Sequence, residues 1–139
     1  GQIEIINSNQ GVIQDRTIYE DVEIFARNLY QMQYMTDRDW QTYKDLFNNM
    51  TQFLRKPDLI IYLRASTDTL LSRIKNRDRN FERDISPEYL HSLNISYDQW
   101  ISRCDDYQVL IIESDGFNIF ENKKQLQHYL NQIEMALTK

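Results

Sequence analysis

Apolar residues fall along this chain in short continuous runs that alternate with longer stretches of helical spacing. Residues 11–14, 58–63 and 108–112 form apolar runs of strand length, and Pro57 precedes the second. Continuous runs rich in β-branched side chains are typical of parallel strands buried on both faces. The sequence therefore predicts three such strands. Residues 2–6 alternate polar and apolar positions, which fits either a further strand or the end of a helix.

The stretches between these runs carry apolar residues three and four positions apart, which predicts helices. The expected helices cover residues 19–35, 37–54, 67–75, 86–105 and 122–137. Two of them have capping sequences, since Thr36 precedes Asp39 by three positions and Ser86 stands directly before Pro87. The order strand-helix-helix-strand-helix-helix-strand-helix predicts an α/β fold of three layers, with a parallel sheet between helices on both faces.

Length and composition predict a single domain with a core of its own. The chain has 139 residues, 41% of them hydrophobic and 27% charged, which fits one domain over residues 1–139. Its net charge of −5 argues against nucleic acid or a membrane surface as a partner. No apolar run approaches the roughly 20 residues of a membrane-spanning helix. Cys104 is the lone cysteine, so we expect a reducing, cytoplasmic setting.

One basic segment contrasts with this acidic composition. Residues 73–83 hold five cations among eleven positions. Arg73 and Arg77 are four positions apart and so share a helix face, and Arg79 lies just beyond them. Guanidinium groups bind phosphate through paired, charge-assisted hydrogen bonds. The segment predicts either a phosphate-gripping lid at about residues 73–86 or a solvated helix end with local acidic partners.

Polar residues also follow the predicted strands. Asp15, Arg16 and Thr17 come directly after the first strand, and Asp115 and Phe117 follow the third. In open parallel sheets, ligands bind outside the carboxyl ends of the strands, so these are candidate binding positions. The charged pair Asp15-Arg16 indicates either a functional site or a salt-bridged helix start.

Two of these motifs resemble those of the deoxynucleoside kinase family. The first is the acidic-Arg-Ser/Thr triplet at residues 15–17, followed by Tyr19 and Asp21 at a helix start, and the second is the arginine-rich lid. The resemblance covers roughly residues 11–115 and is strongest to bacterial deoxyadenosine and deoxyguanosine kinases. It implies a P-loop kinase fold and ATP-dependent phosphorylation of a deoxynucleoside, deoxyadenosine or deoxyguanosine, at its 5′-hydroxyl in nucleotide salvage.

The resemblance implies a role for each residue on the acceptor side. Arg16 matches a catalytic arginine that holds the phosphate-acceptor region, and Asp15 matches its acidic neighbour close to the phosphates. Asp21 matches the residue that binds the nucleobase edge, where a carboxylate suits an amino group because it offers only acceptors. Phe25 matches an aromatic side chain that stacks near the base. Glu82 matches the lid carboxylate that contacts the sugar 3′-hydroxyl.

The remaining implied roles concern ATP. Arg73, Arg77 and Arg79 match lid arginines that contact the ATP phosphates, and Arg77 and Arg79 also serve catalysis by neutralising charge during transfer. Asp115 and Phe117 lie, by position, where adenine of ATP is expected. The family implies ATP and Mg²⁺ as cofactors, but no residue of this chain is assigned as a metal ligand.

One family motif has no match in this sequence. The Gly-rich phosphate loop GxxxxGK[ST] is missing, since Gly1, Gly11 and Gly116 all lack the Lys-Ser/Thr partner. The backbone cradle for the phosphates and the metal-binding hydroxyl go with it. The general-base carboxylate, which the family carries on an early strand, is missing too. We therefore expect an N-terminally truncated form that lacks the central strand of its sheet and is inactive alone.

Two other functions fit the same residues. Nucleoside monophosphate kinases also have arginine-rich lids, although the spacing of residues 15–17 and Asp21 favours a nucleoside acceptor. A non-catalytic helical module would use the aromatic residues of the helices at 19–35 and 37–54, such as Tyr34 and Trp40. The family builds dimers from helices, so we expect a homodimer through these helices, unless the same side chains pack into the core.

Overall fold

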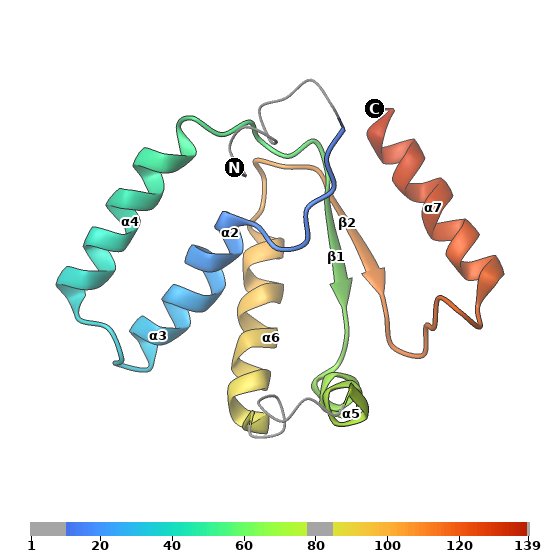
Figure 1. Cartoon of the computed structure of the whole chain (residues 1–139), viewed down its shortest axis with the longest axis horizontal. Helices are drawn as coiled ribbons and strands as arrows, with labels where there is room; N and C mark the ends of the chain where they lie inside the picture. The colour runs from blue at the N-terminus through green and yellow to red at the C-terminus, as the bar shows by residue number, and fades with distance from the viewer. Residues whose placement is uncertain (1–10, 78–84, 139) are drawn as a thin grey trace. The chain divides into compact units, whose positions relative to one another are not determined.

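The computed structural model describes residues 11–77 and 85–138. Contacts divide the chain into two compact units, residues 1–56 and residues 57–139, and each unit is described by itself. Figure 1 shows the order of the elements. The single domain stays a prediction. The expected strand or helix at residues 2–6 and the lid residues Arg79 and Glu82 lie outside the described residues.

The described part of the first unit is built from helices. Helix α2 (Ile18–Glu20) continues into the π-helix η1 (Asp21–Ala26) and then α3 (Arg27–Gln31), and α4 (Asp37–Thr51) follows after a turn. The prediction of two helices here is confirmed, with a π-helical stretch that was not foreseen. The start at Thr36 is confirmed as well, because its hydroxyl accepts a hydrogen bond from the Asp39 N–H at 3.1 Å.

Side chains of α3 and η1 form the centre of this unit. Ile24 and Asn28 are fully buried, and the Asn28 side-chain amide donates to the Ile24 carbonyl at 2.8 Å. At the other end of α3, the Tyr30 ring stacks on Trp40 of α4 with ring centroids 5.3 Å apart. These contacts hold the two helices of the unit together.

The predicted strand at residues 11–14 is wrong. This segment has no regular secondary structure, and the side chains of Val12 and Ile13 are 43% and 102% exposed. An apolar run becomes a strand only where a neighbouring strand takes up its backbone hydrogen bonds. Among the described residues, no strand pairs with this segment.

The second unit contains a two-stranded parallel sheet with helices. Its elements are β1 (Ile60–Arg64), α5 (Thr67–Arg77), α6 (Pro87–Ser102), β2 (Val109–Glu113) and α7 (Lys123–Leu137). The pairing runs in register from Ile60 opposite Val109 to Arg64 opposite Glu113. The other two predicted strands and the three helices of this unit are confirmed, with ends shifted by a few residues.

The sheet lies between α6 and α7, which gives three layers within this unit. On one face, Tyr62 of β1 stacks on Tyr97 of α6 at 5.8 Å and donates its hydroxyl proton to Asp98 at 3.0 Å. Burial, together with Asp98, raises the Tyr62 pKa above its usual range. Leu63 and Ile112 point to the opposite face, because side chains alternate along a strand, and there they line a cavity together with side chains of α7.

Candidate active site

The turn before α2 has an unusual backbone. Arg16 has φ of 62°, in the left-handed region that side chains other than glycine rarely adopt. Thr17 is extended, with φ −130° and ψ 160°, and is the N-cap of α2. Strained residues cluster at binding and catalytic sites, where their surroundings hold them in place. The turn is therefore a candidate site on conformational grounds that are independent of the motif.

Two of the predicted acceptor-side residues come together at this turn. The Arg16 guanidinium lies over the Phe25 ring, with its central carbon 5.1 Å from the ring centroid. A cation held over an aromatic ring contributes about 0.5–1 kcal/mol at an exposed site. Asp15 and Asp21 belong to the same segment of the chain and are exposed. The structure thus brings Arg16 and Phe25 together in the first unit.

The π-helix η1 carries two of these residues. Asp21 begins it and Phe25 lies within its final residues, while Val22, Ile24 and Ala26 are buried. Short π-helical stretches are rare and are found frequently at functional sites. The sequence predicted an ordinary α-helix over this segment, so the π-helix was not predicted.

Glu20 was also missed from the sequence. It lies one residue before Asp21, and burial raises the pKa of its carboxyl, an effect that a backbone hydrogen bond from Thr17 and the charge of Arg16 partly offset. Its Oε2 and the Thr17 hydroxyl oxygen are buried without a hydrogen-bond partner among the described residues. The signal was present, since Thr17 and Glu20 have the Thr-x-x-Glu spacing of a capping box.

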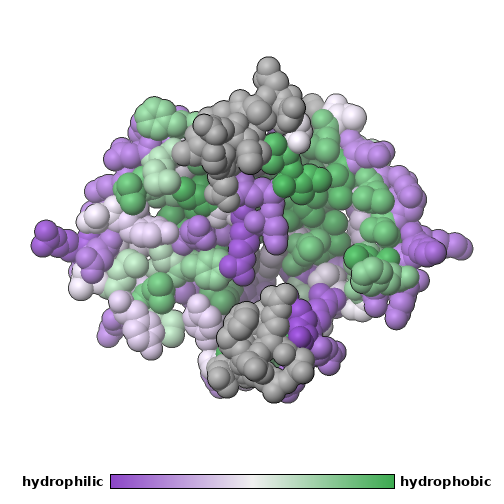
Figure 2. All heavy atoms as spheres, viewed as in Figure 1, coloured by the Kyte–Doolittle hydropathy of each residue, from purple (hydrophilic) through white to green (hydrophobic). Residues whose placement is uncertain are grey.

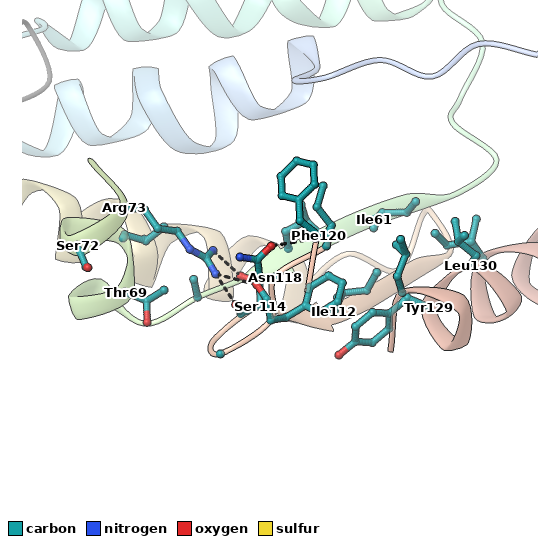
Figure 3. A pocket seen from close by; sticks show the side chains of 18 of the residues that line it. Ile61, Thr69, Ser72, Arg73, Ile112, Ser114, Asn118, Phe120, Tyr129 and Leu130 are labelled. Atoms are coloured by element: carbon teal, nitrogen blue, oxygen red, sulfur yellow. Dashed lines mark hydrogen bonds between the residues drawn. The ribbon is translucent and has the colours of Figure 1, made fainter. Parts of the chain in front are cut away.

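In the second unit, Arg73 of α5 reaches the turn that follows β2. Its guanidinium donates to the Ser114 carbonyl at 2.5 Å, to the Ser114 hydroxyl at 3.1 Å and to the Phe117 carbonyl at 3.5 Å (Figure 3). Two of the residues assigned to ATP, Arg73 and Phe117, are thus in contact, and a third, Asp115, belongs to the same turn after β2. Ser114, which joins them, was not predicted.

Asp115 fixes the start of α5. Its carboxylate accepts a hydrogen bond from the Ser66 N–H at 2.9 Å, and this bond is the main reason that the Asp115 pKa is lowered. The Ser66 hydroxyl in turn accepts from the Thr69 N–H at 3.2 Å. Gly116 follows with φ of 67°, a conformation that suits glycine because it has no Cβ. The strand ends of this unit are therefore linked by short polar contacts.

A cavity of about 1060 Å³ opens beside these contacts in the second unit. Its polar edge includes Thr69, Arg73 and Ser114, and its apolar wall includes Ile112 of the sheet and Leu130 of α7 (Figure 3). Figure 2 shows hydrophobic surface over the strands and along the adjoining side of α7. The cavity combines a guanidinium at one edge with a wide apolar wall.

The two sets of predicted residues belong to different units. The acceptor-side residues lie in the first unit and the ATP-side residues in the second, where Arg77 is exposed as the last residue of α5. Among the residues that the structure describes, no three His, Cys, Asp or Glu side chains come close enough to hold a metal ion. In the same part of the chain, no helix has both the length and the apolar character needed to span a bilayer.

Similarity to known proteins identifies the family of this chain. The deoxynucleoside kinase family pattern matches residues 1–138. The chain belongs to the deoxynucleoside kinase family. A solved structure of deoxyadenosine kinase from M. mycoides with bound dATP superimposes with a TM-score of 0.76 at 30% identity, covering 94% of this chain and 67% of that one. The α/β fold of these kinases is therefore the fold of this chain, as the sequence predicted.

Curated relatives in the deoxynucleoside kinase family are similar over most of this chain. A deoxyadenosine kinase of Dictyostelium discoideum is 44% identical over 106 residues, which are 76% of this chain and 43% of the relative. A deoxyadenosine/deoxycytidine kinase of Bacillus subtilis is 31% identical over 138 residues, 98% of this chain and 64% of the relative. The chain thus spans between 43% and 64% of the length of these relatives.

Proposed function

We propose that the protein carrying this chain transfers the γ-phosphoryl group of ATP to the 5′-hydroxyl of a deoxynucleoside. The observation that carries the proposal is the strained Arg16, whose guanidinium lies over Phe25 just before the π-helix that begins at Asp21. A strained arginine, a ring and an exposed carboxylate are the groups that a phosphate-acceptor site and a base pocket need. Phosphoryl transfer depends mainly on positioning and charge neutralisation, which such groups supply.

In the proposed reaction, the 5′-oxygen bonds to the γ-phosphorus while the bond from that phosphorus to the β-phosphate bridging oxygen breaks. ADP leaves with the electron pair, and the hydroxyl proton passes to a general base. The resemblance places that base outside this sequence, so the chain supplies positioning and charge. Arg16 and Asp15 hold the acceptor end, and Arg77 and Arg79 neutralise the phosphates, with Arg79 lying outside the described residues.

We propose deoxyadenosine as the first acceptor to test, with deoxyguanosine and deoxycytidine as the others. The Asp21 carboxylate is exposed and offers only acceptor atoms, so it favours a base that presents an amino group. Two relatives are named for deoxyadenosine and for deoxyadenosine/deoxycytidine. Phe25 stacks near the base in this proposal, and Glu82 binds the sugar 3′-hydroxyl.

On the donor side, we propose that ATP binds in the second unit near Arg73, Asp115 and Phe117. Each of them lies at the carboxyl end of β2 or is hydrogen-bonded to the turn there, which is where ligands of parallel sheets bind. Mg²⁺ is usually held by one or two carboxylates together with substrate phosphates and water, and the family alone implies it here. Without a GxxxxGK[ST] motif in residues 1–139, we expect this chain alone to be inactive.

The experiment is a phosphate-transfer assay of the full-length protein with radiolabelled ATP. Deoxyadenosine, deoxyguanosine and deoxycytidine are compared with the corresponding monophosphates, and we expect transfer to the nucleosides. Transfer to monophosphates alone would show a nucleoside monophosphate kinase and refute the proposal. Arg77→Ala should lower turnover by at least about tenfold, as loss of a charge-stabilising group does, whereas Arg103→Ala at the exposed C-cap of α6 should leave it unchanged. Transfer by the isolated 139-residue chain would refute the expected inactivity.

We also propose that the protein is a homodimer that associates through helices of the first unit. Several large apolar side chains of this unit are exposed, namely Tyr34 at 75%, Leu46 at 57% and Phe53 at 73%. Large apolar side chains on a surface favour protein–protein contact where they adjoin one another. Sedimentation at micromolar concentration tests this, and a monomer there would count against the proposal. The cytoplasmic location stays a prediction.

A further inference from the structure

Glu20 is the last residue of α2, directly after the turn at residues 15–17, and its carboxylate has no role in the proposed reaction so far. It is the third helical residue after Thr17, the N-cap of α2. In a capping box, a glutamate at this position reaches back to the backbone N–H of the cap residue. The structure has this half of the box, because a backbone hydrogen bond from Thr17 reaches the Glu20 carboxylate. The Thr17 side chain makes no capping bond in return.

The Thr17 N–H belongs to the peptide group that joins Arg16 to Thr17. A hydrogen bond that fixes this N–H therefore fixes the orientation of that peptide plane, which sets ψ of Arg16 and φ of Thr17. Arg16 has a left-handed backbone, with φ of 62°, and a strained conformation persists only where its surroundings determine it. The bond from Thr17 to Glu20 acts on one side of Arg16, and the Phe25 ring acts on its side chain.

We propose that Glu20 is a positioning residue that fixes the Asp15-Arg16-Thr17 turn for phosphoryl transfer. This inference rests on the proposed function. Burying a carboxylate is unfavourable unless it is fully paired, and the Thr17 bond and the Arg16 charge offset the effect of burial on the Glu20 pKa only partly. One of its carboxylate oxygens, Oε2, is buried without a partner among the described residues. Groups that break a local rule in this way occur mainly at functional sites.

The test compares three variants of the full-length protein. Glu20→Ala removes the acceptor of the Thr17 bond, and Glu20→Gln keeps an acceptor oxygen without the charge. Thr36→Ala is the matched control, because it removes the capping bond to the Asp39 N–H in α4 of the same unit. We expect Glu20→Ala to lower kcat about five- to tenfold, the rate equivalent of one lost capping interaction, with KM for the nucleoside nearly unchanged. Glu20→Gln should restore kcat to within about twofold of the wild type.

Thr36→Ala should lose a similar amount of thermal stability while its kcat stays within about twofold of the wild type. Equal loss of kcat in Glu20→Ala and Thr36→Ala would show a merely structural role and overturn the inference. Failure of Glu20→Gln to restore kcat would overturn the hydrogen-bonding argument.

Amide hydrogen exchange at Thr17 gives a readout that does not depend on activity. Exchange at this amide should be about five- to tenfold faster in Glu20→Ala than in the wild type, and unchanged in Thr36→Ala. If the wild-type protein phosphorylates no deoxynucleoside, the proposed function fails, but this exchange still decides whether Glu20 holds the turn. Equal exchange in the wild type and Glu20→Ala would overturn the inference.

Discussion

Arg73 connects helix α5 to the turn after β2, and its removal should destabilise the second unit. The guanidinium donates to both oxygens of Ser114, a residue that is only 6% exposed, and to the Phe117 carbonyl. Arg73→Ala leaves these oxygens with fewer donors in a partly buried place. A hydrogen bond from a charged group contributes about 1.5–3 kcal/mol. The expected loss lies at the low end, about 1.5–2 kcal/mol, because the Ser114 carbonyl keeps the Phe117 N–H as a donor.

Urea unfolding of the purified chain measures this loss. Trp100 is buried in the second unit, so its fluorescence reports on that unit once Trp40 has been replaced by Phe. With a slope of about 2 kcal/mol per molar urea, Arg73→Ala should lower the midpoint by about 1 M. Arg73→Lys should recover only part of it, because an ammonium group lacks the planar fork that reaches two acceptors.

Arg103→Ala is the matched control, because this arginine is exposed in the same unit and its side chain donates only to the Gln99 carbonyl of the preceding helix α6 among the contacts described. An unchanged midpoint in Arg73→Ala would refute the structural role of the guanidinium. If the midpoint is unchanged but full-length Arg73→Ala binds ATP more weakly, the role of Arg73 is phosphate binding, as the sequence alone predicted.

Three further predictions concern the turns. Gly116→Ala should cost about 1–2 kcal/mol in denaturant unfolding, since the left-handed backbone at φ 67° disfavours a side chain although no atom lies within 4 Å of the added Cβ. The lowered pKa of Asp115 stabilises the fold above the usual pKa of 3.8, and this contribution is lost as pH falls through the lower, folded-state pKa. When thermal unfolding is followed from about pH 6 to about pH 2, Asp115→Asn should therefore lack the part of the stability loss that comes from protonation of Asp115. Arg16→Gly should change stability by less than about 0.5 kcal/mol, because relief of strain offsets chain entropy, yet it should abolish phosphoryl transfer in the full-length protein.

Local signals in the sequence predicted much of this fold. Both caps, at Thr36 and Ser86, lie where the sequence placed them, and the helices that follow begin there. Capping and helical spacing depend on neighbours within one or two turns, so they can be read directly. The strand expected at residues 11–14 depended on a partner strand elsewhere, and that information is not contained in a local pattern. The π-helix at Asp21–Ala26 was missed for another reason, since an apolar pattern does not separate π from α geometry over six residues.

The sequence predicted many residues of the candidate site but few of the contacts between them. The motif at residues 15–17 and the arginines of α5 were found from residue type and spacing. The bonds of Arg73 to Ser114 join positions 41 apart, and no spacing rule gives such a pair. Glu20 could have been predicted from its capping-box spacing to Thr17. The family motif instead led to the assignment of its neighbour Asp21.

The parallel pairing of β1 and β2 has a consequence for how the second unit folds. Residue pairs across the sheet are 49 positions apart in sequence, with α5 and α6 between them. The entropy of closing such a loop must be lost before any contact across the sheet forms. Proteins rich in distant contacts fold more slowly than those with local ones. The helices should therefore form early and the sheet late. Until then the backbone edge of β1 remains unpaired and open to other chains, which makes slow folding an aggregation risk during synthesis.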